Sequence, residues 1–279
     1  MTSFLSVDFT IIKNEALLDL SSLIVQENYL FQTWVFDLTP FIIWKVITNM
    51  GESVINEKKS YPEINEDKDV IYMQVLCLKI REKHWKANED IQKIFKEFTT
   101  LPDEINGIIH TRIYRSLRYD SDFIIWLSSR DPSIIRDAMD VIYSKSGHLA
   151  KSTFSMLSIY VKSPYLKNAT HIEEDLKKKG LKYFVGYPMS KDPEWYLIDY
   201  ETRKKIMDEH IKTAMTHPMN QGILSYTTYS FSIADQEFAV LYEVDSLYRW
   251  MKVAESLREV TARKWITKEE PILIGVNIE

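Results

Sequence analysis

The feature that most constrains the fold is a stretch of sequence that occurs twice in similar form. Residues 119–127 (YDSDFIIWL) precede Asp131-Pro132 and a helical pattern, and residues 233–241 (IADQEFAVL) precede Asp245-Ser246 and another helical pattern. Each copy predicts an acidic turn, a buried strand, a helix cap and an amphipathic helix. Chance similarity between two common strand–turn–helix units is the alternative. The repeat predicts a duplicated α+β unit whose two sheets combine into one larger barrel.

Strand and helix patterns alternate along the whole chain. Segments rich in β-branched and aromatic residues predict strands at 4–13, 30–38, 70–80, 108–117, 123–129, 152–161, 182–188, 223–231, 238–244 and 272–278. Apolar residues three and four apart predict helices at 91–98, 132–145, 200–215 and 246–263. This alternation indicates a mixed α+β fold.

Composition excludes several classes of protein. The chain has 279 residues, 45% of them hydrophobic, enough for one large domain or two ordinary ones. A net charge of −5 argues against a nucleic-acid-binding protein, which needs a basic face. No window approaches the length of a membrane span, so no membrane association is expected. The single cysteine, Cys77, allows no intramolecular disulfide, which indicates a reducing compartment, and the expected location is the cytoplasm.

One histidine lies on the apolar stripe of a predicted helix. The apolar side chains within a turn of His210 are those of Ile206, Met207, Ile211 and Ala214. The spacing therefore places the imidazole on the inward face. A buried imidazole needs partners, and two interpretations stay open: a hydrogen-bonded core histidine, or a metal ligand whose second nitrogen contacts a carboxylate or carbonyl.

The segment Gly186-Tyr187-Pro188-Met189-Ser190-Lys191 precedes this helix. The strand is predicted to end at Pro188, where the chain turns, so Tyr187 can point into a cavity and Lys191 lies near a loop. A phenol, a cation and an imidazole together suit an anionic iron porphyrin, with the imidazole on the metal and the cation on a propionate. A surface lysine and a rim tyrosine are the alternative. Phosphate-loop, serine-hydrolase and zinc-protease motifs do not occur in the sequence.

Four spaced motifs resemble the chlorite dismutase superfamily, which includes the peroxide-dependent coproheme decarboxylases. They are YPMSK at 187–191, EWY at 194–196, ETRKKIMDEH at 201–210 and SIADQEF at 232–238. The resemblance is clearest over residues 123–279. It implies an α+β fold of two ferredoxin-like domains that form a shared β-barrel flanked by helices, of the dimeric α+β barrel type. Residues 1–150 would form a first domain without porphyrin, and residues 151–279 a second domain that binds haem b or iron-coproporphyrin III, in a homopentamer.

The resemblance also implies roles for single residues. His210 matches the proximal iron ligand, and Glu259 is a candidate for the carboxylate that polarises its far nitrogen. Tyr187 matches the tyrosine that passes oxidising equivalents to a propionate in the decarboxylases, and Lys191 matches a lysine that holds a propionate. These two residues are the catalytic candidates.

Further candidates would contact the porphyrin. Met189 belongs to the YPMSK motif, Thr261 aligns with a serine near the porphyrin edge, and Arg258 lies close to it in sequence. The distal glutamine of decarboxylases, or the distal arginine of chlorite dismutases, aligns with Ser225, or two residues earlier with Ile223. A serine hydroxyl has neither the charge nor the reach of a guanidinium, which argues against chlorite dismutation.

The predicted function is therefore that of a haem-dependent oxidoreductase. The expected reaction is the oxidative decarboxylation of iron-coproporphyrin III to haem b, with hydrogen peroxide as the second substrate. Two alternatives stay open: a general haem peroxidase of the same fold, and a haem carrier or sensor without turnover. Ser225 favours the carrier, because peroxide cleavage needs help with proton movement at the distal face.

Overall fold

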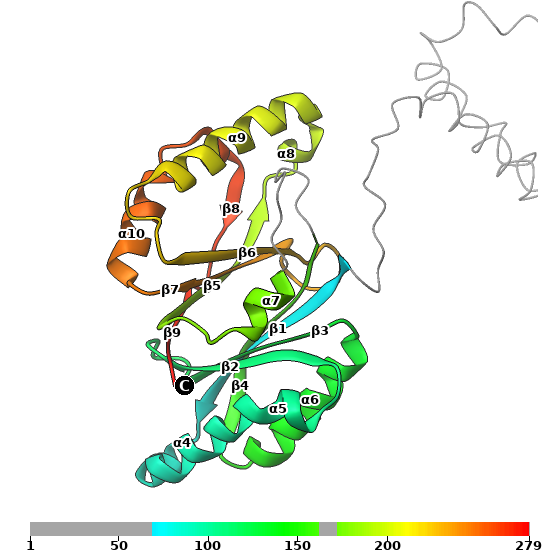
Figure 1. Ribbon diagram of the computed structural model, residues 1–279, viewed down its shortest axis with the longest axis vertical. Helices are drawn as coiled ribbons and strands as arrows, with labels where there is room; N and C mark the ends of the chain where they lie inside the picture. The colour runs from blue at the N-terminus through cyan, green and yellow to red at the C-terminus, as the bar shows by residue number, and fades with distance from the viewer. Residues whose placement is uncertain (1–68, 162–171, 279) are drawn as a thin grey trace, which may run out of the picture. The chain divides into compact units, whose positions relative to one another are not determined.

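The structure, a computed structural model, describes residues 69–161 and 172–278 (Figure 1). Its strands are β1 (Ile71–Ile80), β2 (Ile108–Ser116), β3 (Phe123–Ser129), β4 (Ala150–Tyr160), β5 (Tyr183–Lys191), β6 (Ile223–Tyr229), β7 (Phe238–Val244), β8 (Ile266–Lys268) and β9 (Leu273–Asn277). Its α-helices are α4 (Asn88–Glu97), α5 (Leu101–Glu104), α6 (Pro132–Ser146), α7 (Ile172–Lys177), α8 (Glu194–Leu197), α9 (Tyr200–Thr216) and α10 (Leu247–Ser256). Short 3-10 helices are η3 (Glu82–Ala87), η4 (Phe98–Thr100) and η5 (Thr261–Trp265). The strands predicted at 4–13 and 30–38 lie outside the described residues.

Two βαββαβ units follow each other along the chain. β1, α4, β2, β3, α6 and β4 form the first unit, with the strand order β4-β1-β3-β2. β5, α9, β6, β7, α10 and β9 form the second, with the order β9-β5-β7-β6. Both have the ferredoxin-like arrangement, which confirms the predicted α+β fold class. The two similar stretches of sequence are equivalent in the structure, since β3–α6 and β7–α10 hold the same place in their units.

Side-chain caps set the starts of the helices that flank the sheet. Asp131 and Asp199 accept hydrogen bonds from the backbone N–H groups of Ser133 and Thr202, at 2.8 and 2.9 Å. Ser246 caps α10 in the same way. Each cap satisfies an N–H group that the first helical turn leaves without a partner. In the described part of the chain, none of the helices is both long enough and apolar enough to cross a membrane.

Two antiparallel pairings join the units at both of their edges. β2 pairs with β9 through Tyr114–Ser116, and β4 meets β6 where Ile159 lies opposite Tyr229. Since β5 also pairs with β7, the nine-stranded sheet closes on itself. β4 pairs with β1 along its length and belongs to the first unit, although the predicted division at residue 150 assigned most of it to the second domain. The separation into a porphyrin-free and a porphyrin-binding domain stays a prediction.

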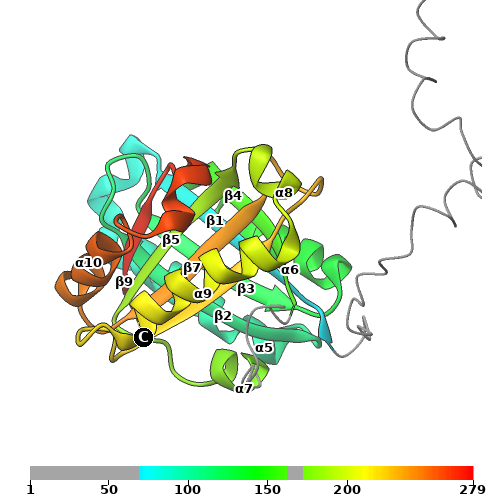
Figure 2. The same ribbon diagram turned by 90° about the horizontal axis from the view of Figure 1, so that it is seen from above.

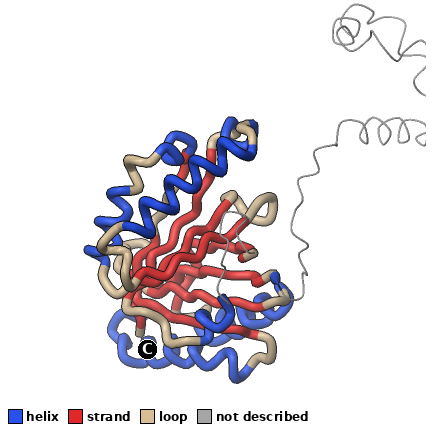
Figure 3. Tube along the Cα trace, turned by 45° about the horizontal axis from the view of Figure 1, so that its top comes forward, coloured by secondary structure: helices blue, strands red, loops and turns tan. Residues whose placement is uncertain are grey.

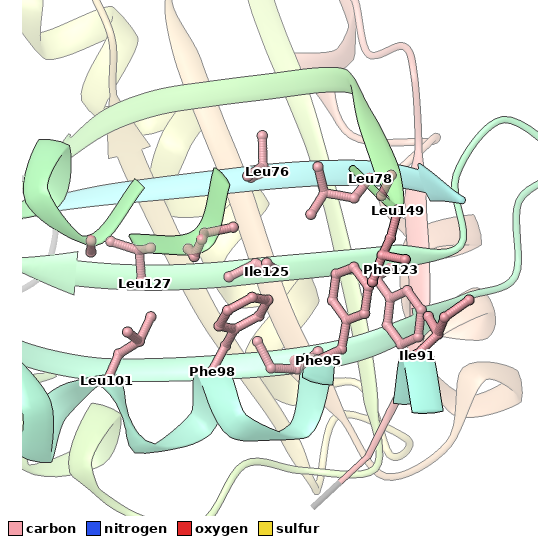
Figure 4. Close-up of a cluster of buried hydrophobic side chains, with 14 of the residues drawn as sticks. Leu76, Leu78, Ile91, Phe95, Phe98, Leu101, Phe123, Ile125, Leu127 and Leu149 are labelled. Atoms are coloured by element: carbon pink, nitrogen blue, oxygen red, sulfur yellow. The ribbon is translucent and has the colours of Figure 1, made fainter. Parts of the chain in front are cut away.

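Helices cover the outer face of the sheet on two opposite sides (Figure 3). Under α4, α5 and α6 the layer is solid, because the strands and helices interlock large apolar side chains (Figure 4). The rings of Phe95 and Phe123 stack there at 3.9 Å, and Phe98, Ile125 and Leu127 fill the space beside them. A second core fills the inside of the closed sheet with residues from both units, among them Trp126, Phe184 and Leu241.

A buried ion pair links the two units inside the closed sheet. The guanidinium of Arg112, on β2, contacts the carboxylate of Glu243, on β7, and their side chains are 3% and 0% exposed. The carboxylate also accepts hydrogen bonds from the Tyr114 hydroxyl at 2.9 Å and the Leu181 N–H at 3.1 Å. Arg112 donates to three backbone carbonyls in and after α7, those of Asp175, Leu176 and Lys178. Burial raises the pKa of Glu243, and Arg112 opposes the rise.

Removing one partner of this pair should destabilise the protein strongly. Glu243→Gln leaves the Arg112 charge buried without a counter-ion, and we expect the free energy of unfolding in urea to fall by about 3–5 kcal/mol. Asp208→Asn is the control, because it removes a carboxylate from the exposed ion pair with Lys204 on α9 and should cost less than about 1 kcal/mol. Equal losses in the two variants would contradict the linking role of the buried pair.

Candidate functional site

A cavity of about 610 Å³ lies between the strands of the second unit and helices α9 and α10. Figure 2, a view from above, shows α9 crossing over the strands with α10 beside it. The strand side of the cavity is lined by Val185, Tyr187, Met189, Lys191, Val240 and Tyr242, and the helix side by Met207, His210, Leu247, Trp250 and Met251. Most of these side chains are apolar, so the few polar groups among them define its chemistry.

β5 presents alternate residues to the cavity. The strand runs without interruption to Lys191, so the prediction that it ends at Pro188 is wrong. Pro188 lies opposite Ala239 of β7, while the pairing with β9 has ended at Gly186; proline is tolerated where a strand has a neighbour on one side only. Because successive side chains of a strand point to opposite faces, Tyr187, Met189 and Lys191 all reach the same cavity.

His210 lies on the face of α9 that is turned toward the strands. Ile206 is buried one turn earlier, and Met207 lines the cavity with His210. Burial and the neighbouring charge of Lys191 lower the pKa of the imidazole, and Glu209 opposes this effect. At neutral pH the ring is therefore uncharged, and one of its nitrogens has the lone pair that a metal ion requires.

Tyr187 lies beside a second tyrosine, Tyr242 of β7. Their rings stack with centroids 6.2 Å apart, and the Tyr242 hydroxyl interacts with the side chains of Tyr187 and Ser225. Burial, then the proximity of Tyr242, raises the pKa of Tyr187 well above its usual value. Tyr187 is therefore a neutral phenol at physiological pH, and the neighbouring Tyr242 oxygen can accept a hydrogen bond from it.

Lys191 is a buried cation at the end of β5. Its Nζ lies 3.4 Å from the centroid of the Trp195 ring, a close cation–π contact, and its backbone N–H donates to Glu237 at 2.8 Å. Burial, with the positive charge of Arg203, lowers the pKa of Lys191 to about 8, and Glu237 opposes the change. The ammonium thus lacks a strong counter-ion in the free protein, which suits it to an anionic ligand.

Of the two residues predicted near the porphyrin edge, Arg258 lines the cavity and Thr261 does not. Thr261, at the start of η5, donates its backbone N–H to Glu209 at 3.1 Å. Glu259 is exposed after α10, and the carboxylate whose charge acts on His210 is that of Glu209. The role of Glu259 as a partner of the imidazole stays a prediction.

The strand β6 presents a neutral side chain to the cavity. Ser225 and Ile223 lie on the same face of β6 as Thr227, because they are separated from it by two and four residues. Thr227 lines the cavity. Ser225 does not line it, but its side chain interacts with that of Tyr242, which does.

Four functional candidates were missed by sequence reasoning. Tyr242 and Trp250, whose rings pack 4.1 Å apart, line the cavity with Arg263 and Glu269. Tyr242 could have been found from the alternation along residues 238–244, which pairs it with Val240 on one face. Arg263 and Glu269 carry no such signal, since they lie in a charged segment that resembles ordinary protein surface.

A sequence profile and a curated relative point to the same protein family. The sequence profile described as Chlorite dismutase matches residues 86–278. A coproheme decarboxylase of Mycolicibacterium smegmatis is 24% identical over 200 residues, covering 69% of this chain and 84% of the relative.

Solved structures share the fold. The crystal structure of TA0507, assigned to the chlorite dismutases, has a TM-score of 0.70 at 45% identity and covers 76% of this chain and 96% of its own. A haem-binding protein from Thermus thermophilus has a TM-score of 0.64 at 14% identity, with 76% of this chain and 92% of its own covered. The family profile spans well over half of the chain, from α4 of the first unit through the second unit, and includes the cavity. The chain therefore belongs to the chlorite dismutase family.

Proposed function

We propose that the protein is a haem-dependent oxidoreductase that binds an iron tetrapyrrole, haem b or iron-coproporphyrin III, in the cavity beside His210. The favoured reaction is the peroxide-dependent decarboxylation of iron-coproporphyrin III to haem b. The name of the Mycolicibacterium smegmatis relative, a coproheme decarboxylase, supports this choice. The cavity and its polar residues supply the physical argument.

The residues of the cavity fit such a group in size and chemistry. A volume of about 610 Å³ falls within the range of small-molecule and cofactor pockets, about 300–1,000 Å³. Val185, Val240 and Trp250 offer apolar walls, and the neutral imidazole of His210 faces the space between them. Lys191 and Arg258 supply positive charge for the carboxylates that such a ligand carries.

Each polar residue has a distinct task in this proposal. The bound iron tetrapyrrole supplies the redox chemistry with hydrogen peroxide. His210 would hold the metal through one ring nitrogen, and Lys191 would hold a propionate carboxylate. Tyr187 would release its phenolic proton beside a second carboxylate, toward the Tyr242 hydroxyl with which it interacts. Met189 would pack against the ligand from the same face of β5.

The strand side of the cavity argues against chlorite dismutation. Among the described residues, the strands contribute one cation to the cavity, Lys191, whose charge acts on His210. Thr227 presents only a neutral hydroxyl there, which cannot hold an anionic oxychlorine species as a guanidinium does.

The neutral side chain that β6 presents to the cavity favours a second candidate, a haem carrier or sensor without turnover. Thr227 supplies no strong proton donor or base, and peroxide cleavage depends on proton transfer. A general haem peroxidase would use the same pocket with Tyr187 as a bystander. Assembly as a homopentamer and a cytoplasmic location stay predictions.

One observation carries the proposal: equivalent layers of the two units differ. The layer between strands and helices is filled by aromatic and aliphatic side chains in the first unit. In the second unit the corresponding layer encloses the cavity, with His210 on its helix side. A repeat that stays solid in one copy and hollow in the other indicates a ligand site in the hollow copy.

Tyr187→Phe should separate binding from turnover. Removing the hydroxyl leaves the ring in the wall, so the affinity for iron-coproporphyrin III should change less than about threefold. Stepwise loss of carbon dioxide from the porphyrin after peroxide addition, followed by mass spectrometry, should stop. Tyr183→Phe is the matched control, because Tyr183 lies on the same face of β5 outside the cavity lining and its replacement should leave turnover intact. Turnover by Tyr187→Phe at the rate of the unmodified protein would exclude a role of the Tyr187 hydroxyl in the reaction.

Binding should weaken in alkaline solution. The pKa of Lys191 is about 8 in the free protein, and a bound carboxylate raises it, so binding above pH 8 requires uptake of a proton. The affinity for iron-coproporphyrin III should be constant just below pH 8 and fall by up to about tenfold per pH unit above it. Lys191→Met should remove this dependence, while Lys182→Met, just before the other end of β5, should retain it. An affinity that rises with pH would contradict the role of Lys191.

A further inference from the structure

Two arginines at the border of the cavity share one carboxylate. Nη1 of Arg258 lies 2.6 Å from Oε2 of Glu269, and Nη1 of Arg263 contacts the same oxygen. All three side chains line the cavity. Arg258 follows α10, Arg263 lies in η5 and Glu269 follows β8, so three separate segments meet at this point. Two cations and one anion leave an excess positive charge there.

This cluster lies at the end of the cavity where Tyr187 is found. The charges of Glu269 and Arg258 act in opposite directions on the Tyr187 hydroxyl. Lys191 occupies a different place, above the Trp195 ring and near His210. The cavity therefore has two separate sources of positive charge, and the one near Tyr187 is partly neutralised by an ion-paired carboxylate, that of Glu269.

The ion pairs of the cluster are open to exchange. The side chains of Arg258 and Arg263 are 50% and 35% exposed, and that of Glu269 is 18% exposed. Ion pairs with this access to water contribute little to stability, because solvent screens them. A ligand carboxylate offers both guanidinium groups the same contacts that Glu269 provides, so it can replace Glu269 as their partner while the Glu269 carboxylate moves toward water.

We propose that Glu269 is an internal substitute for a ligand carboxylate. It occupies the Arg258–Arg263 pair in the free protein and is displaced when a carboxylate of the tetrapyrrole binds beside Tyr187. This inference rests on the proposed function, since it requires a tetrapyrrole in the cavity. It makes Arg263 and Glu269 specificity-determining residues, which select ligands with an ionised carboxylate at this end over uncharged ones.

Equilibrium binding tests the displacement directly. Iron-coproporphyrin III and its tetramethyl ester would be titrated into the full chain while tryptophan fluorescence is recorded. Glu269→Gln removes the competing charge, so the affinity for the acid should rise about tenfold while the affinity for the ester stays unchanged. Glu270→Gln is the matched control, because it removes the same charge from the exposed neighbouring position and should alter neither affinity.

A second variant keeps the inference testable if Glu269→Gln folds poorly. Arg263→Gln should lower the affinity for the acid about tenfold and leave that for the ester unchanged. Unchanged or weaker binding of the acid by a folded Glu269→Gln protein would overturn the displacement while leaving the proposed function intact. Failure of the unmodified protein to bind either porphyrin would refute the proposed function itself.

Discussion

The contact between Arg112 and Glu243 is the interaction on which the arrangement of the site depends. It joins β2 of the first unit to β7 of the second where water is excluded, and Arg112 also holds the backbone in and after α7. Since side chains alternate along β7, fixing Glu243 inside the closed sheet turns Val240 and Tyr242 outward to the cavity. A charge pair in the interior thus sets the register of the wall that faces His210.

Duplication with divergence accounts for the rest of the architecture. Both units use the same βαββαβ order, yet Phe95, Phe98 and Phe123 fill the layer beneath the first pair of helices. In the second unit, small side chains such as those of Ala254 on α10 and Thr227 on β6 line the cavity instead. The first unit gives rigidity through a solid layer, and the second offers space lined by one neutral imidazole and several cations. We therefore propose that one copy of the motif serves stability and the other ligand binding.

The sequence predicted the elements better than the contacts between them. The strands at 123–129 and 238–244 were predicted with their observed bounds, because dense β-branched and aromatic residues mark buried strands. β8 was missed, since three residues carry no detectable period, and the helix predicted over 246–263 ends at Ser256. The pairing of Arg112 with Glu243, 131 positions apart, and the meeting of Arg258, Arg263 and Glu269 depend on the closed sheet. Periodicity along the chain does not encode such long-range contacts.

In the proposed function, the imidazole of His210 binds the iron of a tetrapyrrole in this cavity. Resonance Raman and absorption spectra of the protein reconstituted with iron-coproporphyrin III, and separately with haem b, test it most directly. We expect a histidine-ligated iron in the unmodified protein and in His217→Ala, because His217 ends the same helix outside the cavity lining. We expect the iron–histidine signal to be lost in His210→Ala. An unchanged signal in His210→Ala would contradict it.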